Sequence, residues 1–360
     1  MSEALQGLIA NEIRAGGPIG VDRFMALALG HPLHGYYVTR DPLGATGDFT
    51  TAPEISQMFG ELIGLWCVSV WLSLGSPERF GLVELGPGRG TLMADLLRAA
   101  RIVPGFGAAA AVHLVETSPV LRARQAAVLG ATGVEPTWHA GLDTLPGEMP
   151  LIVVANEFFD ALPIRQWVRA GARWHERMVG LDEAGAFAFG LAPLPDTAIG
   201  APAPDGTVLE IGFTARSAMA ALAGRVVAQA GALLAIDYGH VNSRFGETLQ
   251  AVRHHAKADP LCAPGDVDLT AHVDFAALAT AARTAGALVH GPARQGAFLR
   301  ALGLEARAAA LARGRADQTG ALAAAVSRLA DPHPGMGELF KVLAATSPAM
   351  TVPGFAGGGA

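Results

Sequence analysis

The stretch Gly81-Leu-Val-Glu-Leu-Gly-Pro-Gly-Arg-Gly90 decides the fold, because a short apolar run enters a tight turn that contains three glycines. Gly86, Gly88 and Gly90 tolerate positive φ angles, and without a Cβ they let backbone amides approach a bound group closely. A helix is predicted from 90 to 100, and its first N–H groups can bind a carboxylate. The pattern therefore predicts a strand–turn–helix unit with a ligand at its turn, although a purely structural turn would have a similar sequence.

The spacing of these glycines distinguishes between two kinds of cofactor. A dinucleotide fingerprint, G-x-G-x-x-G, requires glycine at position 91, where this chain has Thr91. Here the glycines alternate with other residues, and Glu84 lies two residues before the first of them. This tighter form resembles motif I of class I S-adenosyl-L-methionine-dependent methyltransferases, which holds an amino acid rather than a pyrophosphate. The resemblance implies S-adenosyl-L-methionine as the cofactor, with four candidate binding residues: Glu84, Gly86, Gly88 and Gly90.

A second acidic residue ends the next predicted strand, His113-Leu-Val-Glu-Thr117. At that position the carboxylate of Glu116 can accept hydrogen bonds from both ribose hydroxyls, as in dinucleotide folds. The alternative is a solvated or helix-capping glutamate, because Thr117 and the Ser-Pro pair after it favour a helix start. Trp138 follows the third strand, where it either packs in the core or stacks beside adenine. The glycine turn and Glu116 follow consecutive predicted strands, and together they favour a nucleoside cofactor.

Outward from this stretch, short apolar runs alternate with helical patterns, which predicts an α/β fold with a mostly parallel sheet and helices on both faces. The predicted strands are 81–85, 111–115, 135–139, 151–155 and 232–236, with a possible last strand in 288–298. Helices are predicted at 119–129, 275–285 and 304–329. Strands at 166–168, 173–179 and 186–191 predict an antiparallel insertion before the fifth strand, followed by a Pro-rich loop.

These patterns divide the chain into four regions. We expect an N-terminal region of helices and loops at 1–80, a cofactor-binding methyltransferase domain at 81–163 and 214–350, an inserted β-meander that serves as a lid or substrate platform at 164–213, and a disordered Gly-rich tail at 353–360.

Composition excludes several classes of protein. With 51% hydrophobic and 16% charged residues the chain can build a large core. Its formal charge of −6 argues against nucleic-acid binding. The longest uncharged apolar run, 62–77, is shorter than a membrane span and continues an amphipathic pattern from Ile55, so we interpret it as a core helix. Two distant cysteines and the absence of a secretory signal or mitochondrial presequence favour a bacterial, cytoplasmic protein.

Polar side chains follow the buried run 151–155. Ligands of open parallel sheets lie beyond the carboxyl ends of the strands, so Asn156, Glu157 and Asp160 are candidate site residues. Asn156 is a plausible orienter of the nucleophile and a cofactor contact, since the fourth strand of class I methyltransferases ends beside the sulfonium. The two carboxylates suit a guanidinium, whose planar donor fork they can bind. The alternative is that they cap the next helix or pair with Arg165.

Two further polar segments are candidates for the rim of the site. The loop before the first apolar helix contains Asp48, Phe49 and Thr50, which either cover the cofactor or simply precede a helix cap at Thr51 or Ser56. The segment 265–275 contains Asp268, Thr270 and His272, which can face the substrate, although a lone histidine there is more often structural. The pair at 254–255 lacks further ligands at metal spacing, so no metal site is predicted.

Several of these segments resemble the MidA-like methyltransferases, a family that includes the mitochondrial complex I assembly factor 7. They are 47–61, 83–91, 155–163, 236–239, 265–275 and 336–342, so the resemblance extends from about Ile19 to Val342. It implies a class I methyltransferase that methylates a protein arginine. In the mitochondrial branch the reaction is symmetric dimethylation of the 49-kDa-type subunit of respiratory NADH dehydrogenase during complex I assembly.

Three functional hypotheses follow. The first is a protein-arginine methyltransferase in which the glycine turn and Glu116 bind the cofactor and Glu157 with Asp160 binds guanidinium. The second is a methyltransferase that acts on a small molecule, with the insertion as a closed lid. The third is a non-catalytic assembly factor with a vestigial cofactor fold. The acceptor, the number of methyl groups and the oligomeric state do not follow from the sequence.

Overall fold

The structure is a computed structural model that describes residues 2–40, 51–253 and 256–355. The chain forms two compact units, each assembled from separate segments. Unit 1 contains Met1–Phe49, Phe159–Arg216 and Asn242–Val273, and unit 2 contains Thr50–Phe158, Ser217–Val241 and Asp274–Ala360.

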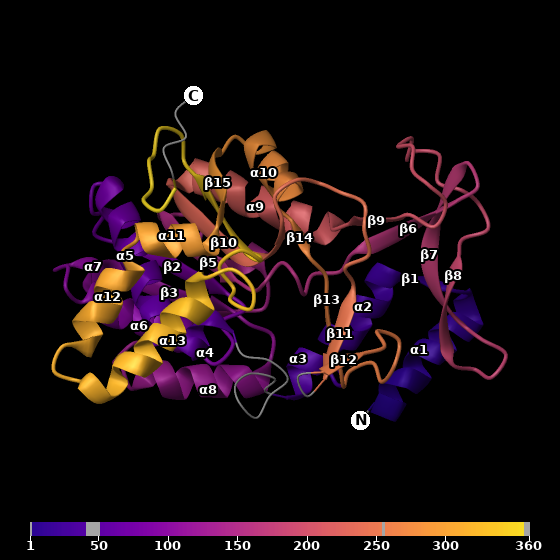
Figure 1. The fold of residues 1–360 in the computed structure, drawn as a ribbon, viewed down its shortest axis with the longest axis horizontal. Coiled ribbons are helices and arrows are strands. Elements are labelled where there is room, and N and C mark those ends of the chain that lie inside the picture. Colours follow the sequence, from indigo (N-terminus) through magenta and orange to yellow (C-terminus); the bar gives the residue numbers. More distant parts are fainter. Residues whose placement is uncertain (1, 41–50, 254–255, 356–360) are drawn as a thin grey trace. The chain divides into compact units, whose positions relative to one another are not determined.

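Unit 2 is built on a mixed, mostly parallel sheet (Figure 1). β10 pairs with β5, β5 with β2, β2 with β3 and β3 with β4 in parallel, whereas β16 runs antiparallel to both β10 and β15. The order across the sheet is β15 (Leu288–Arg294), β16 (Phe340–Thr346), β10 (Gly231–His240), β5 (Leu151–Asn156), β2 (Phe80–Leu85), β3 (Ala110–Val115) and β4 (Thr137–His139). The strand order reverses between β2 and β5, so the crevice for a ligand is expected at their carboxyl ends.

Both faces of this sheet are buried, as the continuous apolar runs predict. In β5 the side chains of Ile152 and Val154 join the cluster formed with α5 and α6, and the alternate residues Val153 and Ala155 are equally buried on the opposite face. The helical elements are α4 (Ala52–Ile55), α5 (Gln57–Ser73), α6 (Thr91–Ala100), α7 (Phe106–Ala109), α8 (Pro119–Gly130), η1 (Leu142–Thr144), α9 (Phe213–Gln229), α10 (Phe275–Thr284), α11 (Gln295–Ala301), α12 (Leu304–Ala312), η2 (Ala316–Gln318) and α13 (Thr319–Ala330).

Unit 1 contains the predicted antiparallel meander. Its sheet has the order β1 (Ile19–Gly20), β7 (Arg173–Leu181), β6 (Arg165–Ala170) and β9 (Val208–Ile211), and β8 (Phe187–Leu191) pairs with β7. A separate core packs this sheet against α1 (Ser2–Gly16) and α2 (Val21–Gly30), with Leu5, Phe24 and Val179 buried in it. The remaining elements of unit 1 are α3 (Tyr36–Thr39), β11 (Gln250–Arg253), β12 (Ala256–Ala258) and β13 (Asp268–Thr270). The short strand β14 (Val273–Asp274) pairs with β10 and belongs to the larger sheet.

Three of the predicted elements are wrong in part. The helix predicted over 304–329 is divided into α12 and α13, because Gly314 between them has a φ of +74°. The strand predicted within 288–298 ends at Arg294, and α11 begins there. The apolar helix predicted around the run 62–77 is α5, which begins only at Gln57 and ends at Ser73. It begins there because Ser56 is extended and its hydroxyl accepts from the Met58 N–H at 3.2 Å. Within the described part of the chain, no helix is long and apolar enough for a bilayer.

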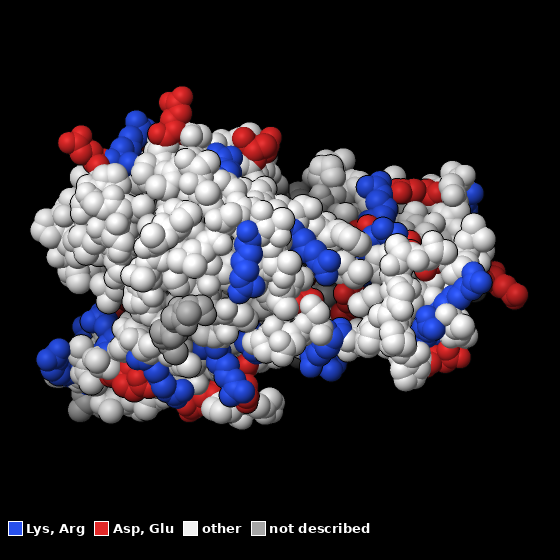
Figure 2. Space-filling model, turned by 90° about the horizontal axis from the view of Figure 1, so that it is seen from above, with Lys and Arg blue, Asp and Glu red and all other residues white. Residues whose placement is uncertain are grey.

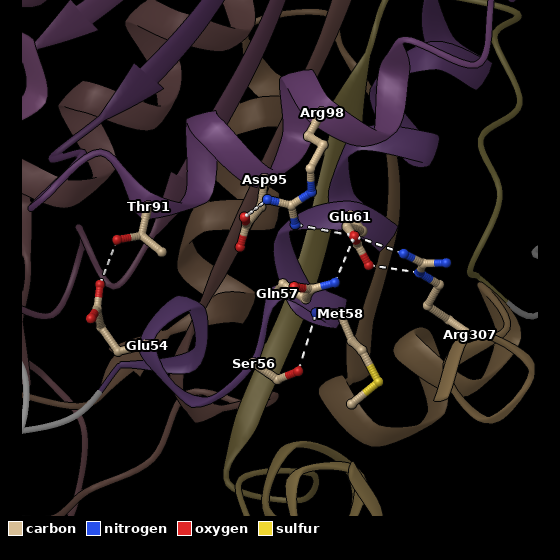
Figure 3. Close-up of polar contacts among 9 residues, drawn as sticks. All are labelled: Glu54, Ser56, Gln57, Met58, Glu61, Thr91, Asp95, Arg98 and Arg307. Carbon is tan, nitrogen blue, oxygen red and sulfur yellow. Dashed lines mark hydrogen bonds and ion pairs between the residues drawn. The ribbon is translucent and has the colours of Figure 1, made fainter. Parts of the chain in front are cut away.

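A buried ion network fastens α12 to the main body of unit 2 (Figure 3). Glu61 of α5 is 3% exposed, and Arg307 donates to its two oxygens at 2.7 and 2.8 Å. Arg98 donates to the same carboxylate at 3.1 Å and to Asp95 at 2.6 Å. These arginines hold the pKa of Glu61 below its usual value against the opposing effect of burial. We assign this network to structure, since buried carboxylates of this kind must be paired.

Charged side chains are dispersed over the molecule. On the face shown in Figure 2, Lys and Arg alternate with Asp and Glu, and much of the described surface carries neither. The chain has 26 basic and 32 acidic residues among its 360 positions. This face therefore presents no broad basic surface among the described residues of the kind that phosphate backbones require.

Candidate functional site

The glycine turn has the backbone conformation that its sequence predicts. Gly86, Gly88 and Gly90 have φ angles of +59°, +53° and +84°, all in the left-handed region that favours glycine. The Gly86 N–H donates to the carbonyl of Val115 at 3.1 Å, which ties the turn to the end of β3. α6 begins at the next residue, and no side chain caps its N-terminus. The N–H groups of Gly86 and Gly90 both donate within the protein, so the other amides of the turn and those of the first turn of α6 are the ones that can face an anionic group.

Glu84 lies in β2 just before the turn and is only 3% exposed. The Met93 backbone N–H donates to its carboxyl group, but burial dominates and raises the pKa of Glu84 to about 8. Its Oε2 atom has no hydrogen-bond partner among the described residues. A buried acceptor without a partner is costly, so a ligand with a cationic donor would be stabilised here.

Glu116 directly follows β3 and is also buried. Its Oε1 accepts from the Ser118 N–H at 2.8 Å, and its Oε2 accepts from the Gln125 side-chain amide at 3.1 Å. Burial raises the pKa of Glu116 against these hydrogen bonds. A carboxylate has about four acceptor sites, so it retains capacity for hydroxyl donors. The capping alternative also holds in part, because Ser118 is the N-cap of α8 and Glu116 binds its backbone.

Gln125 was not among the candidates from the sequence, and it joins three of them. Its amide nitrogen donates to the Gly88 carbonyl at 2.7 Å as well as to Glu116, and its oxygen accepts from the Trp138 indole at 2.8 Å. A signal for it was present, because the buried residues of α8 are Leu121, Gln125 and Leu129. A glutamine in the centre of an apolar i, i+4, i+8 row is a polar group that needs buried partners.

Trp138 packs in the core, as the first of its two interpretations predicts. Its ring packs against the main core cluster, and its indole N–H reaches the glutamine that touches the glycine turn. The structure thus brings Trp138, Glu116 and Gly88 to a common partner. Stacking on an adenine remains a prediction.

The end of β5 carries a backbone outlier. Glu157 has a φ of +51°, a conformation that costs a non-glycine residue about 1–2 kcal/mol, and its N–H donates to the Ile236 carbonyl at 2.9 Å. Its Oε1 accepts from the Asn156 amide at 3.2 Å and from the Ala52 N–H at 3.3 Å. The Asn156 Oδ1 atom is buried and has no partner among the described residues. Strain of this kind clusters at functional sites.

α4 contacts both the glycine turn region after β2 and the residues after β5. Ala52 of α4 donates to Glu157 after β5, and Glu54 accepts from the Thr91 hydroxyl at 2.6 Å (Figure 3). Arg89 of the glycine turn lies 3.7 Å from the second oxygen of Glu54. The segment that the sequence analysis places over the cofactor is therefore attached to both strand ends. Its predicted site residues Asp48, Phe49 and Thr50 lie outside the described residues, as does the histidine pair 254–255.

The other candidates lie in unit 1. Asp160 is 6% exposed, and its carbonyl accepts from the Ala271 N–H at 3.0 Å. The Tyr37 hydroxyl donates to Asp268 at 2.7 Å, and burial together with the charges of Asp268 and Asp160 raises the pKa of Tyr37 well above its usual value. The His272 N–H donates to the Thr248 hydroxyl at 2.9 Å. Roles of Asp160 and His272 in a site remain predictions. Arg165 pairs with Glu176.

The raised pKa of Glu84 predicts an unusual dependence of stability on pH. Between about 4.5 and 8 the folded protein keeps a proton on Glu84 that the unfolded chain releases, so folding loses stability as pH rises, by up to about 1.4 kcal/mol per pH unit. Glu84→Gln is expected to remove this contribution, so the difference in unfolding free energy between the variant and wild type should change with pH over this range. Urea unfolding at about pH 5, 6, 7 and 8 measures both curves.

Glu61→Gln is the matched control for this experiment. The pKa of Glu61 is lowered, so its stabilisation is complete above the unfolded value of 4.5 and is lost only below it. The substitution should lower stability by a constant amount across the same pH range. A difference between Glu84→Gln and wild type that stays constant with pH would show that Glu84 does not keep its proton in this range.

Comparisons with known proteins agree with this geometry. A family model described as "Putative S-adenosyl-L-methionine-dependent methyltransferase" matches residues 62–293. The chain is 36% identical over 381 residues to the protein arginine methyltransferase NDUFAF7 homolog, mitochondrial, of Drosophila melanogaster, a match over 95% of this chain and 86% of that protein. It is 37% identical over 325 residues to protein arginine methyltransferase NDUFAF7, mitochondrial, of Homo sapiens, over 82% of this chain and 72% of that protein.

A solved structure from Burkholderia thailandensis, bound to S-adenosyl-homocysteine, superimposes with a TM-score of 0.86 at 32% identity. The match covers 99% of this chain and 93% of that chain. Similarity of this extent includes the glycine turn and the strand ends described above.

Proposed function

Because the chain belongs to a family of S-adenosyl-L-methionine-dependent methyltransferases, we propose that its acceptor is the guanidinium group of an arginine in a protein. The family has the class I methyltransferase fold, and its cofactor is S-adenosyl-L-methionine. Both agree with the prediction from the sequence. The names of the relatives support arginine as the acceptor. The observation that carries the proposal is the carboxylate of Glu157, a residue directly after β5 whose backbone is strained.

The residues at the carboxyl ends of β2 and β3 fit this cofactor. When the cofactor is bound, the glycine turn would offer N–H groups to its amino-acid carboxylate. The Oε2 atom of Glu84 would accept from the ammonium group once Glu84 has lost its proton, which the cationic ammonium favours. The carboxylate of Glu116 accepts from the ribose hydroxyls. Asn156, whose Oδ1 also lacks a partner, orients the group that receives the methyl. When bound, the cofactor supplies an electrophilic methyl group on a sulfonium.

The chain's own contribution to transfer is mainly positioning and charge. Glu157 is held by Ala52 and Asn156, so its carboxylate has a defined direction. A carboxylate binds a guanidinium through the planar donor fork, and it stabilises the positive charge that the acceptor nitrogen retains until its proton leaves. Asp160, three residues later, is the second carboxylate of this proposal. Alignment of the nitrogen with the methyl group provides most of the rate gain.

The further details of the proposal concern the target. We propose a subunit of respiratory NADH dehydrogenase as the protein substrate and symmetric dimethylation as the outcome, on the strength of the resemblance to the complex I assembly factor. The two free cysteines, Cys67 and Cys262, are compatible with a reducing compartment such as the bacterial cytoplasm.

A labelled-methyl assay tests the acceptor class. The purified protein is incubated with methyl-labelled S-adenosylmethionine and either the 49-kDa-type NADH dehydrogenase subunit of the same organism or a panel of small amines and guanidines. We expect label on an arginine of the subunit, with fragmentation that identifies symmetric dimethylarginine. Label on small acceptors alone would support the metabolite alternative. Tight binding of S-adenosylhomocysteine with no transfer to either would support the non-catalytic alternative.

A further inference from the structure

Gln125 is a fully buried polar residue at the boundary of the cofactor region. It lies on the inner face of α8 with 0% of its surface exposed, between Leu121 and Leu129. The burial of an amide is unfavourable unless its donors and acceptor are all satisfied. An apolar side chain would fill this volume at lower cost if packing were the only requirement.

The amide of Gln125 meets three different partners. Its Nε2 donates to the Gly88 carbonyl at 2.7 Å and to Glu116 Oε2 at 3.1 Å, while its Oε1 accepts from Trp138 Nε1 at 2.8 Å. The orientation of the amide follows from chemistry, because an indole N–H can only donate and a carbonyl can only accept. Two donors and one acceptor in a plane are what this position needs, and only an amide side chain supplies them without charge.

The backbone of the glycine turn packs closely against α8 beside Gln125. A Cβ on Gly90 would lie 3.4 Å from Gln125 Cα, so the last glycine of the turn is packed directly on α8. Gln125 therefore connects the glycine turn, the carboxylate that ends β3 and the indole on β4 from a single rigid helix. Movement of its amide would disturb all three together.

We propose that Gln125 is a positioning residue that sets the affinity for the cofactor ribose by holding the Glu116 carboxylate in place against the glycine turn. The inference rests on the proposed function, in which Glu116 accepts from the ribose hydroxyls. Without the Gln125 donor, Glu116 keeps its bond to the Ser118 N–H but loses the contact on its second oxygen, so the carboxylate can rotate away from the ribose. Gln125 itself touches no ligand in this mechanism.

A comparison of two ligands distinguishes a positioning role of Gln125 from an effect on protein stability alone. Calorimetry gives the dissociation constants of S-adenosylhomocysteine and its 2′-deoxy analogue, and their ratio reports the ribose contact. We expect the analogue to bind wild-type protein about tenfold more weakly, the value of one hydrogen bond to a charged group. In Gln125→Met the ratio should fall toward one, while the affinity for the parent ligand falls about tenfold. Gln125→Leu, which is uncharged and supplies no donor, should give the same result if the methionine variant does not fold.

Gln166→Met is the matched control. Gln166 is equally buried and its amide also donates to a carboxylate, Glu210 Oε1 at 2.7 Å, but in unit 1. It should lower the melting temperature and leave the ligand ratio at the wild-type value.

A failure of the proposed function and a failure of the positioning role give different results. If Glu116→Ala retains the wild-type ratio, the ribose assignment of the proposed function is wrong. If Glu116→Ala abolishes the ratio but the folded Gln125 variant retains it, the positioning role is overturned and Gln125 is structural.

Discussion

Gly88→Val is expected to weaken the binding of S-adenosylhomocysteine at least about hundredfold while the sheet of unit 2 remains folded. Gly88 has a φ of +53°, and a β-branched residue there costs roughly 1–2 kcal/mol or more in backbone strain. Relief of that strain would move the Gly88 carbonyl away from Gln125 and turn the amides of the loop away from the ligand. A tenfold change corresponds to about 1.4 kcal/mol, so a modest displacement is sufficient. Calorimetric titration measures the effect.

Gly171→Val provides the control for strain alone. Gly171 occupies the tight turn between β6 and β7 with a φ of +58°, and a Cβ there would meet nothing within 4 Å. This variant should lose similar folding stability and bind the ligand as wild type does. Wild-type affinity in a folded Gly88→Val protein, or an equal loss in both variants, would contradict the role of the glycine turn.

The elements that the sequence predicted well are those with an unambiguous local sequence signal. The continuous apolar runs that became β2, β3, β5 and β10 have no solvated face, and the glycine turn requires positive φ angles that few other sequences tolerate. The pairing of Ser118 with the following proline also predicted the start of α8 correctly. Local chemistry was sufficient in these places because tertiary contacts reinforce the local preference.

The remainder depends on contacts that no local pattern reveals. β16 was not predicted as a strand, because Lys341 interrupts its apolar run. The Lys341 ammonium is buried, and it donates to the carbonyls of Glu338 and Leu339. The row of Leu121, Gln125 and Leu129 marks Gln125 as a buried polar group, but its role could not be predicted, because its three partners are distributed over 50 residues, from Gly88 to Trp138. The left-handed backbone of Glu157 has no sequence signal, since this conformation is unfavourable for glutamate and results from the surrounding structure.

Glu157→Gln is expected to lower the rate of arginine methylation about 10²- to 10³-fold and to leave the affinity for S-adenosylhomocysteine nearly unchanged. Glutamine has the same shape, and its oxygen can still accept from Ala52 and Asn156, so the backbone conformation should persist. It lacks the negative charge that holds and stabilises a guanidinium, and loss of one such group costs roughly 2.7–4 kcal/mol in comparable sites. Mass spectrometry of the co-expressed NADH dehydrogenase subunit, together with single-turnover rates, measures the effect.

Glu176→Gln is the appropriate comparison, because Glu176 already binds a guanidinium within the protein. Arg165 donates to its two oxygens at 2.6 and 2.5 Å, so this substitution removes a carboxylate–guanidinium pair from unit 1. We expect lower stability and near-normal methylation per folded molecule. If Glu157→Gln methylates the subunit at the wild-type rate, the guanidinium is bound elsewhere, and the buried Asp160 becomes the next carboxylate to replace. A loss of cofactor affinity in Glu157→Gln would instead place this side chain in the cofactor site, since a defect confined to the acceptor lowers the transfer rate without weakening S-adenosylhomocysteine.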